Sequence, residues 1–277
     1  MLFNANKFSS HLLPRLLRFS TAYVREKAKS AGIIVIGDEI LKGDVVDTNS
    51  SYMTPKLHEI GVQVKKIVVI GDDLKEITNE VRSFSSKYNY VITTGGIGPT
   101  HDDVTFEGVS LAFNERLIVH PELYKLCCEF FNTTDINYPG MKLSRVPQSS
   151  ILTYPQSHKS YPNVRVKNVY MFPGVPQLFQ KSFNLLHKEL FYSPTKFYSK
   201  VLYLTVSEDK VAPYLDNLVK SNPNVLFGSY PDITNKLYMV RVCLESVDQD
   251  AVNSAYEKLI SSIPEQYIAE IDNNKRK

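Results

Sequence analysis

Short apolar runs alternate with stretches of helical periodicity along the first third of the chain. Residues 33–36 form a continuous apolar run, which is typical of a parallel strand covered on both faces. Residues 49–60 follow with apolar positions at helical spacing, and Pro55 among them favours a kink or a late start of this helix. The strand pattern returns at residues 62–70 and 90–93, with a second helical pattern between them. This alternation predicts an α/β fold with a doubly wound, mostly parallel sheet.

The pattern changes in the second half of the chain. Residues 144–168 are rich in Ser, Pro, Asn and Lys, and we expect them to form an excursion over the surface. After residues 193–194 the predicted order becomes strand, helix, strand, strand, helix, which suits a second, smaller α+β domain of two layers. These elements are expected at residues 197–206, 208–220, 225–230, 237–244 and 248–260.

The composition places the chain among globular proteins. The 277 residues are 43% hydrophobic and 22% charged, which allows a real core and excludes global disorder. No stretch approaches the roughly 20 apolar residues of a membrane-spanning helix. Three cysteines, two of them adjacent at Cys127 and Cys128, give neither a disulfide framework nor a zinc pattern. We therefore expect the adjacent pair to be small buried hydrophobic residues in a reducing compartment.

The positive charge is concentrated at the N-terminus. Residues 1–29 hold six basic residues and one acidic residue, and basic and apolar stripes recur there at helical spacing, which is typical of a mitochondrial transit peptide. A frayed tail on a cytoplasmic protein is the alternative. The remaining residues hold 26 of the 32 basic and 28 of the 29 acidic side chains, a net charge of −2. This balance argues against nucleic-acid binding by the folded body.

The chemistry is concentrated in residues 93–105, which read TTGGIGPTHDDVT. Gly95, Gly96 and Gly98 come directly after a predicted strand, at the edge where open α/β sheets bind ligands. Glycines let backbone N–H groups approach an anion, and the helix expected from near Thr105 points its positive end at the same place. The run predicts a phosphate cradle, to which the hydroxyls of Thr94, Thr100 and Thr105 could add donors.

An acidic pair, Asp102 and Asp103, abuts this cradle. Carboxylates would repel a bare phosphate, so their place here makes sense if a divalent metal bridges carboxylate and phosphate oxygens, or if one acid activates water. A glycine-rich turn with an Asp that caps the next helix is the alternative, and the spacing leaves both interpretations open.

These residues also resemble a known family. The run is similar to the T-G-G-x-G-P-T-x-D-D-x-T motif of the molybdopterin-binding (MoaB/MogA-like) domain superfamily, in its CinA-like branch. Three further segments agree in the expected order, at residues 37–43 (GDEILKG), 47–50 (DTNS) and 172–176 (FPGVP). Their form is most similar to the N-terminal domain of animal-type FAD synthases, and the residues after 194 resemble the small domain that follows there. The resemblance implies a MogA-like domain at residues 30–195 and an accessory domain at residues 196–277.

The resemblance implies a metal-dependent nucleotide pyrophosphatase, with Mg, Mn or Co, that cleaves FAD to FMN and AMP, or cleaves ADP-ribose. It assigns Asp102 and Asp103 to the metal, and Asp103 corresponds to the essential acid of the MogA-like branch. Asp38 and Glu39 would complete the metal shell or bind ribose hydroxyls, with turn and cap roles as the alternative. Lys42 beside them is either a phosphate partner or a solvated side chain.

Other functions remain open at this stage. Synthesis of FAD is not expected, because the chain ends at Lys277 before an adenylyltransferase domain could begin. A non-catalytic module that holds molybdopterin or a flavin nucleotide, or that partners a separate FAD synthase chain, would use the same glycine loop. RNA binding by residues 196–270 is disfavoured, because they lack a basic stripe. The expected partner is thus a nucleotide or molybdopterin, with no nucleic acid or membrane, and a homo-oligomer is left open.

Overall fold

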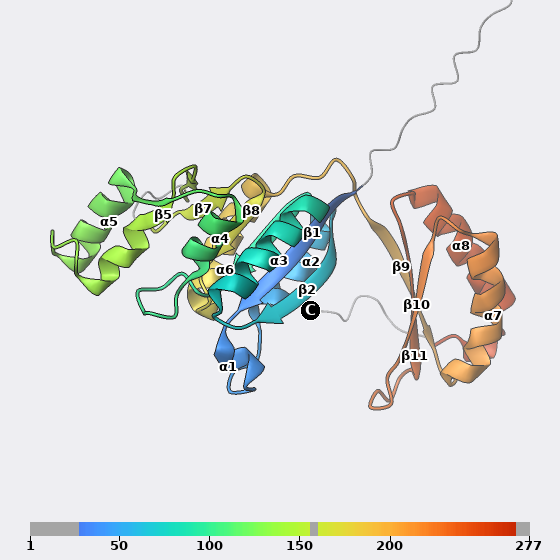
Figure 1. The fold of residues 1–277 in the computed structure, drawn as a ribbon. Coiled ribbons are helices and arrows are strands. Elements are labelled where there is room, and N and C mark those ends of the chain that lie inside the picture. The colour runs from blue at the N-terminus through green and yellow to red at the C-terminus, as the bar shows by residue number, and fades with distance from the viewer. Residues whose placement is uncertain (1–27, 156–159, 270–277) are drawn as a thin grey trace, which may run out of the picture.

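The computed structural model describes residues 28–155 and 160–269, which form two separately packed units (Figure 1). The first unit holds a six-stranded sheet and the second a three-stranded sheet. The predicted transit peptide lies almost wholly outside the described residues, so the structure does not test it. The α/β fold class with a smaller α+β unit is confirmed.

The main sheet has the strand order β2-β1-β3-β8-β7-β6. Its first four strands in this order are mutually parallel, so that their carboxyl ends meet at one edge. β7 runs antiparallel to both of its neighbours. The six strands are β1 (Lys29–Ile36), β2 (Val62–Ile70), β3 (Tyr90–Thr94), β6 (Ile151–Thr153), β7 (Asn163–Val166) and β8 (Val169–Phe172).

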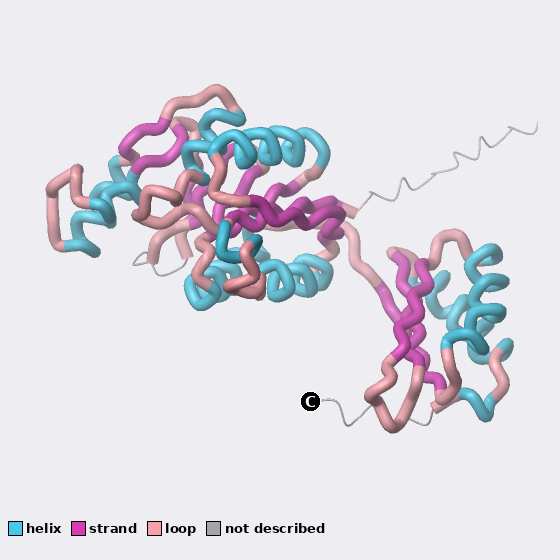
Figure 2. The backbone as a smooth tube through the Cα atoms, turned by 60° about the horizontal axis from the view of Figure 1, so that its bottom comes forward, coloured by secondary structure: helices cyan, strands magenta, loops and turns pink. Residues whose placement is uncertain are grey.

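Helices cover both faces of this sheet (Figure 2). Ile34 and Ile36 of β1 point to a core that holds the apolar faces of α3 (Leu74–Lys87) and α4 (Thr105–Ala112). Ile33 and Val35 point to the other core, under α2 (Asn49–Glu59) and α6 (Pro176–Leu190). All four of these β1 side chains are buried. This explains the continuous apolar run of the first strand, since both of its faces are covered.

The helix α2 begins earlier than Pro55 suggested. It starts at Asn49 and runs through Pro55 to Glu59, so the expectation of a late start is wrong. The Asp47 carboxylate accepts the backbone N–H groups of Asn49 and Ser50, which satisfies the first turn before the proline is reached. Gly61, at φ +79°, ends the helical segment.

Residues 144–168 are not only a surface excursion, contrary to our expectation. Two of their segments, β6 and β7, extend the main sheet, and Val164 and Val166 are fully buried. Another segment, β5 (Arg145–Pro147), pairs with β4 (Leu117–Val119) in a separate two-stranded sheet. The helix α5 (Pro121–Phe131) precedes β5 in the chain, and a 3₁₀ turn, η1 (Pro139–Ser144), lies between them.

The second unit has the predicted element order. Its antiparallel sheet has the order β10-β11-β9, and its core is formed by one face of this sheet and by two helices. A short 3₁₀ turn, η2 (Glu265–Tyr267), follows. The main elements are β9 (Tyr198–Leu204), α7 (Glu208–Ser221), β10 (Leu226–Pro231), β11 (Val240–Ser246) and α8 (Gln249–Ser262).

The structure bears on two expectations from the composition, which concern membrane-spanning helices and the cysteines. None of the helices in the described residues is long and apolar enough to cross a membrane. The three cysteines carry free thiols, and Cys127 is buried as expected, whereas its neighbour Cys128 is only partly buried, contrary to our expectation. Burial raises the pKa of the Cys127 thiol to about 11, so it stays protonated at neutral pH.

Candidate functional site

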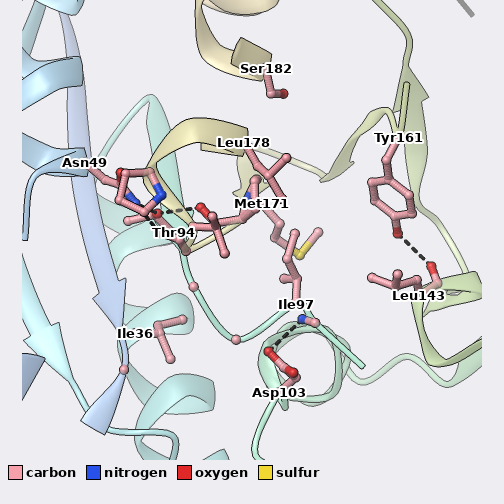
Figure 3. Close-up of a pocket in the computed structure, with 18 of the residues that line it drawn as sticks. Ile36, Asn49, Thr94, Ile97, Asp103, Leu143, Tyr161, Met171, Leu178 and Ser182 are labelled. Carbon is pink, nitrogen blue, oxygen red and sulfur yellow. Dashed lines mark hydrogen bonds between the residues drawn. The ribbon is translucent and has the colours of Figure 1, made fainter. Parts of the chain in front are cut away.

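A cavity of about 900 Å³ opens at the edge where the parallel strands end. The loops that follow β1, β2, β3 and β8 line it, together with the first turns of α2 and α6 and part of α5. Asn49 and Tyr161 lie on opposite sides of this cavity, and the loop that leads to Asp103 passes between them (Figure 3). The position is the one that the topology of an open α/β sheet predicts for a ligand.

The loop from Gly95 to Val104 joins β3 to α4 and forms one wall of the cavity. Gly95 and Gly96 have φ angles of +105° and +64°, which residues with a side chain rarely adopt. A Cβ at Gly95 would lie 2.0 Å from the carbonyl oxygen of Ile36, so β3 and β1 leave no space there. A Cβ at Gly96 would lie 2.3 Å from Oγ1 of Thr105. Both glycines are therefore required by the packing of the loop against the protein.

Asp103 holds the same loop from its far end. Its carboxylate accepts the N–H of Gly98 at 2.6 Å and the N–H of Thr100 at 2.8 Å. The hydroxyl of Thr100 also donates to it, at 2.5 Å. Both carboxylate oxygens are thus engaged by protein donors, and the Gly98 N–H that was predicted to bind phosphate is used here. The geometry makes Asp103 a residue that shapes the loop, while its metal role stays a prediction.

Two of the predicted hydroxyl donors also serve the protein. Thr94 and Thr105 are buried, and their hydroxyls donate to the carbonyl oxygens of Pro173 and Gly95, each at 2.9 Å. The Gly95 N–H donates to Phe172 O at 3.1 Å. Of the three loop glycines, Gly96 is the one whose N–H has no hydrogen-bond partner among the described residues. The sequence therefore identified the loop correctly, but assigned to the ligand several groups that brace the loop.

Asp102 is the exposed member of the acidic pair and lines the cavity. The hydroxyl of Thr100 lowers the pKa of Asp102, with further contributions from the backbone and from the nearby His101 and Lys142. Lys142, in η1, donates from Nζ to Thr100 O at 2.7 Å, which places a positive charge beside the loop. The sequence had not indicated that this lysine lies near the loop. Asp102 is ionised at neutral pH, and it is available to a ligand or cation.

The predicted acids after β1 divide into two roles. Glu39 lines the cavity, whereas the N–H of Asp38 donates to the Asp72 carboxylate at 3.0 Å and the N–H of Asp72 donates to the Asp38 carboxylate at 3.3 Å. Lys42 pairs with Asp38 at 3.3 Å, and both side chains are more than half exposed. Lys42 therefore neutralises a surface carboxylate in the short helix α1 (Asp38–Leu41).

Asp72, which follows β2, is a cavity residue that the sequence analysis missed. Burial raises its pKa, and the negative charges of Glu39, Asp38 and Asp102 add to this effect. It lies two residues after the strand that the sequence predicted at residues 62–70. Its place at the carboxyl end of a parallel strand is the signal that could have identified it.

The opposite wall of the cavity is apolar. Tyr161 forms part of it and donates its hydroxyl to Leu143 O at 2.6 Å (Figure 3). Burial raises the pKa of Tyr161 well above its ordinary value, so the ring is a neutral wall. The cavity thus combines carboxylates and a glycine loop on one side with a surface for a flat or apolar group on the other. Further apolar residues that line the cavity include Leu126, Phe130, Phe131, Leu143, Met171 and Leu178.

A metal ion would need ligands beyond those the protein supplies. Within residues 28–155 and 160–269, no group of three or more His, Cys, Asp or Glu side chains is placed to hold one. The carboxylates of Glu39, Asp72 and Asp102 line the cavity, as do those of Asp47 and Asp103, which accept backbone N–H groups. Burial raises the pKa of Asp72, and the negative charges of its neighbours add to this effect. Mg²⁺ is commonly held by one or two carboxylates plus substrate phosphates. The residues present fit a cation of this kind when a phosphate accompanies it.

Comparison with known families agrees with this architecture. A family described as "Probable molybdopterin binding domain" matches residues 32–192, which is more than half of the chain. The chain belongs to this molybdopterin-binding domain family, as its motifs predicted. A second model, described as "FAD synthase, middle domain", matches residues 196–272. Membership of this family indicates that the ligand is a small molecule.

Individual relatives refine this placement. A "Probable FAD synthase" of Caenorhabditis briggsae is 35% identical over 259 residues, which cover 84% of this chain and 50% of that protein. A protein of Archaeoglobus fulgidus is 35% identical over 233 residues, which cover 83% of this chain and 97% of that protein. The chain spans about half the length of the FAD synthase-named relatives that it matches.

A solved structure shares the fold of the first unit. The crystal structure of CinA from Thermoplasma acidophilum, described as a protein with unknown function, is 28% identical and superposes with a TM-score of 0.54. The match covers 59% of this chain and 99% of that chain. The predicted resemblance to the CinA-like branch and the α/β fold of the first unit are therefore confirmed.

Proposed function

We propose that this chain is a nucleotide pyrophosphatase that uses a divalent metal to split a dinucleotide such as FAD, or to split ADP-ribose. The observation that carries the proposal is the composition of the single cavity described above. Its glycine loop, its carboxylates at Glu39, Asp72 and Asp102, and its apolar wall correspond to the phosphates, the cation and the ring system of a dinucleotide. A volume of about 900 Å³ suits a ligand of that size.

The reaction would be a hydrolysis at phosphorus. The oxygen of a water molecule forms a bond to one phosphorus of the pyrophosphate, and the bond from that phosphorus to the bridging oxygen breaks. The bridging oxygen leaves with the other mononucleotide, so that FAD yields FMN and AMP and the protons of the water pass to solvent. A bound cation would neutralise phosphate charge, as in other phosphoryl transfers.

The residues of this chain would share the remaining tasks. The N–H of Gly96 and the positive end of α4 face the phosphates. Asp102, which is exposed and ionised, is the carboxylate best placed to meet a cation or to orient water, and Glu39 and Asp72 lie on the same side of the cavity. Asp103 acts through the loop, since its oxygens already hold Gly98 and Thr100.

One observation favours the alternative of a binding module without turnover. The described protein groups do not by themselves complete a metal site, and Asp103 is engaged by the loop. A module that holds molybdopterin or a flavin nucleotide, or that partners a separate FAD synthase chain, needs the cradle but no free acid. The FAD synthase-named relatives support a link to flavin metabolism under either proposal.

The test is incubation of the purified chain with FAD, ADP-ribose and NADH, each with Mg²⁺, Mn²⁺, Co²⁺ or EDTA. Chromatography should show FMN and AMP in equal amounts from FAD, with metal only. The Asp102→Ala protein is the control for contaminating phosphatases and should give no product. Nucleotide binding by calorimetry with no product under any metal would support the binding module and refute the hydrolase.

A further inference from the structure

Asn49, the first residue of α2, contacts the ends of two strands at the cavity. Its Nδ2 donates to Thr94 Oγ1 at 2.9 Å and to Gly174 O at 2.7 Å (Figure 3). Thr94 Oγ1 already donates its own hydrogen to Pro173 O, so it can only accept from Asn49. Thr94 Oγ1 and Gly174 O therefore both act as acceptors. They fix the orientation of the Asn49 amide, with its nitrogen toward these two oxygens.

This orientation leaves the amide oxygen of Asn49 unused. Oδ1 has no hydrogen-bond partner among the described residues, although the residue is only 6% exposed. A buried acceptor without a donor is unfavourable, and native proteins rarely keep one without a reason. Asn49 is also one of the residues that line the cavity. A ligand in the cavity is thus the available source of a donor for this oxygen.

The surroundings of Asn49 indicate which ligand group supplies the donor. Gly174, which accepts from Asn49, packs directly on the glycine loop, since a Cβ there would lie 3.1 Å from Gly95 Cα. The helix α6 begins just after it, without a side-chain cap, and Lys181 of this helix lines the cavity. The uncapped start of α6 and Lys181 favour an anion in this part of the cavity, and the Asp47 carboxylate, which also lines it, is engaged by the N–H groups of Asn49 and Ser50. The acceptor itself needs a hydroxyl or amino group.

A 5′-nucleotide carries these two groups next to each other. Its ribose hydroxyls are close to the phosphate in the covalent structure, whereas the amino groups of the base are farther away. We propose that Asn49 Oδ1 accepts a hydrogen bond from a ribose hydroxyl of the bound nucleotide, and so selects nucleotides that carry this hydroxyl. The inference rests on the proposed nucleotide ligand and adds a specificity-determining residue to it.

The test is a binding cycle that uses AMP, 2′-deoxy-AMP and 3′-deoxy-AMP as probes. Calorimetry measures the affinity of each for the full wild-type chain and for the Asn49→Ala protein. In the wild type, loss of the recognised hydroxyl should weaken binding about tenfold, the size of one hydrogen bond. In Asn49→Ala, AMP and that analogue should bind equally weakly, because no acceptor remains to distinguish them.

Asn163 provides a matched control. It also carries a buried Oδ1 without a partner among the described residues, and its Nδ2 donates to Met171 O at 2.9 Å, but it does not line the cavity. Asn163→Ala should keep the wild-type preference for AMP. If Asn163→Ala loses this preference too, the effect comes from the fold and the inference is overturned.

The wild-type protein alone can also overturn the inference, whether or not Asn49→Ala folds. Equal affinity for AMP and both deoxy analogues would show that no ribose hydroxyl is recognised, while hydrolysis of a dinucleotide would still support the proposed function. Failure of all three probes and of the dinucleotides to bind would remove the proposed nucleotide ligand and this inference together. Retention of the tenfold preference in Asn49→Ala would assign it to another residue.

Discussion

The carboxylate of Asp103 accepts the backbone N–H of Gly98, five residues earlier, at 2.6 Å. The same carboxylate accepts the N–H and the hydroxyl of Thr100. Three donors from two residues thus converge on one acid, and the loop between them is closed into a compact turn. The neighbouring Asp102 lines the cavity without such a role.

This contrast predicts opposite results for alanine substitutions at the two positions. Asp103→Ala should lower the free energy of unfolding by about 1–2 kcal/mol, because it leaves the Gly98 and Thr100 N–H groups without their acceptor. Asp102→Ala should leave the stability unchanged and abolish turnover. Urea denaturation and product analysis measure the two effects. An Asp103→Ala protein with wild-type stability would contradict the structural role given to this carboxylate.

A substitution at Gly96 should lower the free energy of unfolding by more than the positive φ angle of Gly96 alone implies. Gly96→Ala combines a positive φ with a Cβ placed 2.3 Å from Thr105 Oγ1, so we expect a loss of about 2–3 kcal/mol. Gly43→Ala is the control, because Gly43 has φ +78° and open space around its Cβ position. It should cost only about 1 kcal/mol. Equal losses in thermal or urea unfolding would refute the contact with Thr105 as the cause.

Asp72 should make the protein less stable as the pH rises. Its folded-state pKa is raised above 3.8, so its favourable contribution is present below pH 3.8 and is lost as the pH rises through the folded-state pKa. Asp72→Asn should therefore increase stability at pH 7, by roughly 0.5 kcal/mol after allowance for solvent screening. The asparagine oxygen can still accept from the N–H of Asp38.

Unfolding measured from pH 3 to pH 8 provides the check. The difference in stability between Asp72→Asn and the wild type should grow with pH. Asp209→Asn is the control, since the hydroxyl of Ser207 lowers the pKa of Asp209 and the same substitution should not stabilise there. A constant difference across the pH range would contradict the assignment.

Residues 1–29 should direct a reporter to mitochondria, because their basic and apolar stripes have the pattern of a transit peptide. A fluorescent fusion of these residues should colocalise with a mitochondrial dye, and the Arg15→Glu/Arg18→Glu fusion should remain cytosolic. Cytosolic fluorescence of both fusions would favour the cytoplasmic alternative.

Local signals account for the parts of the fold that the sequence predicted well. The helix α8 was expected at residues 248–260 and occurs at Gln249–Ser262, because its apolar spacing and its capping acid, Asp248, are encoded within one segment. The strands β6 and β7 were missed because they are short and become strands only by pairing with β8, which follows them in the chain. Such pairings depend on contacts that periodicity does not describe.

In the site, too, the sequence could not show which individual atoms contact one another. The sequence placed a glycine loop and an acidic pair together, but it could not show that the oxygens of Asp103 face the loop and that the hydroxyl of Thr105 faces Gly95. Asn49 and Asp72 were visible as members of turns and helix starts. Their contribution to the cavity depends on which strand ends lie side by side in the sheet.

The hydrogen bond from Thr105 to Gly95 O has a consequence for binding affinity. Together with the bond from the Thr105 N–H to Gly96 O, it ties the first turn of α4 to the end of β3 before any ligand arrives. The conformational entropy of ordering this loop is therefore lost during folding and not during association. An incoming anion meets a rigid, preorganised receptor, and more of its interaction energy remains as affinity.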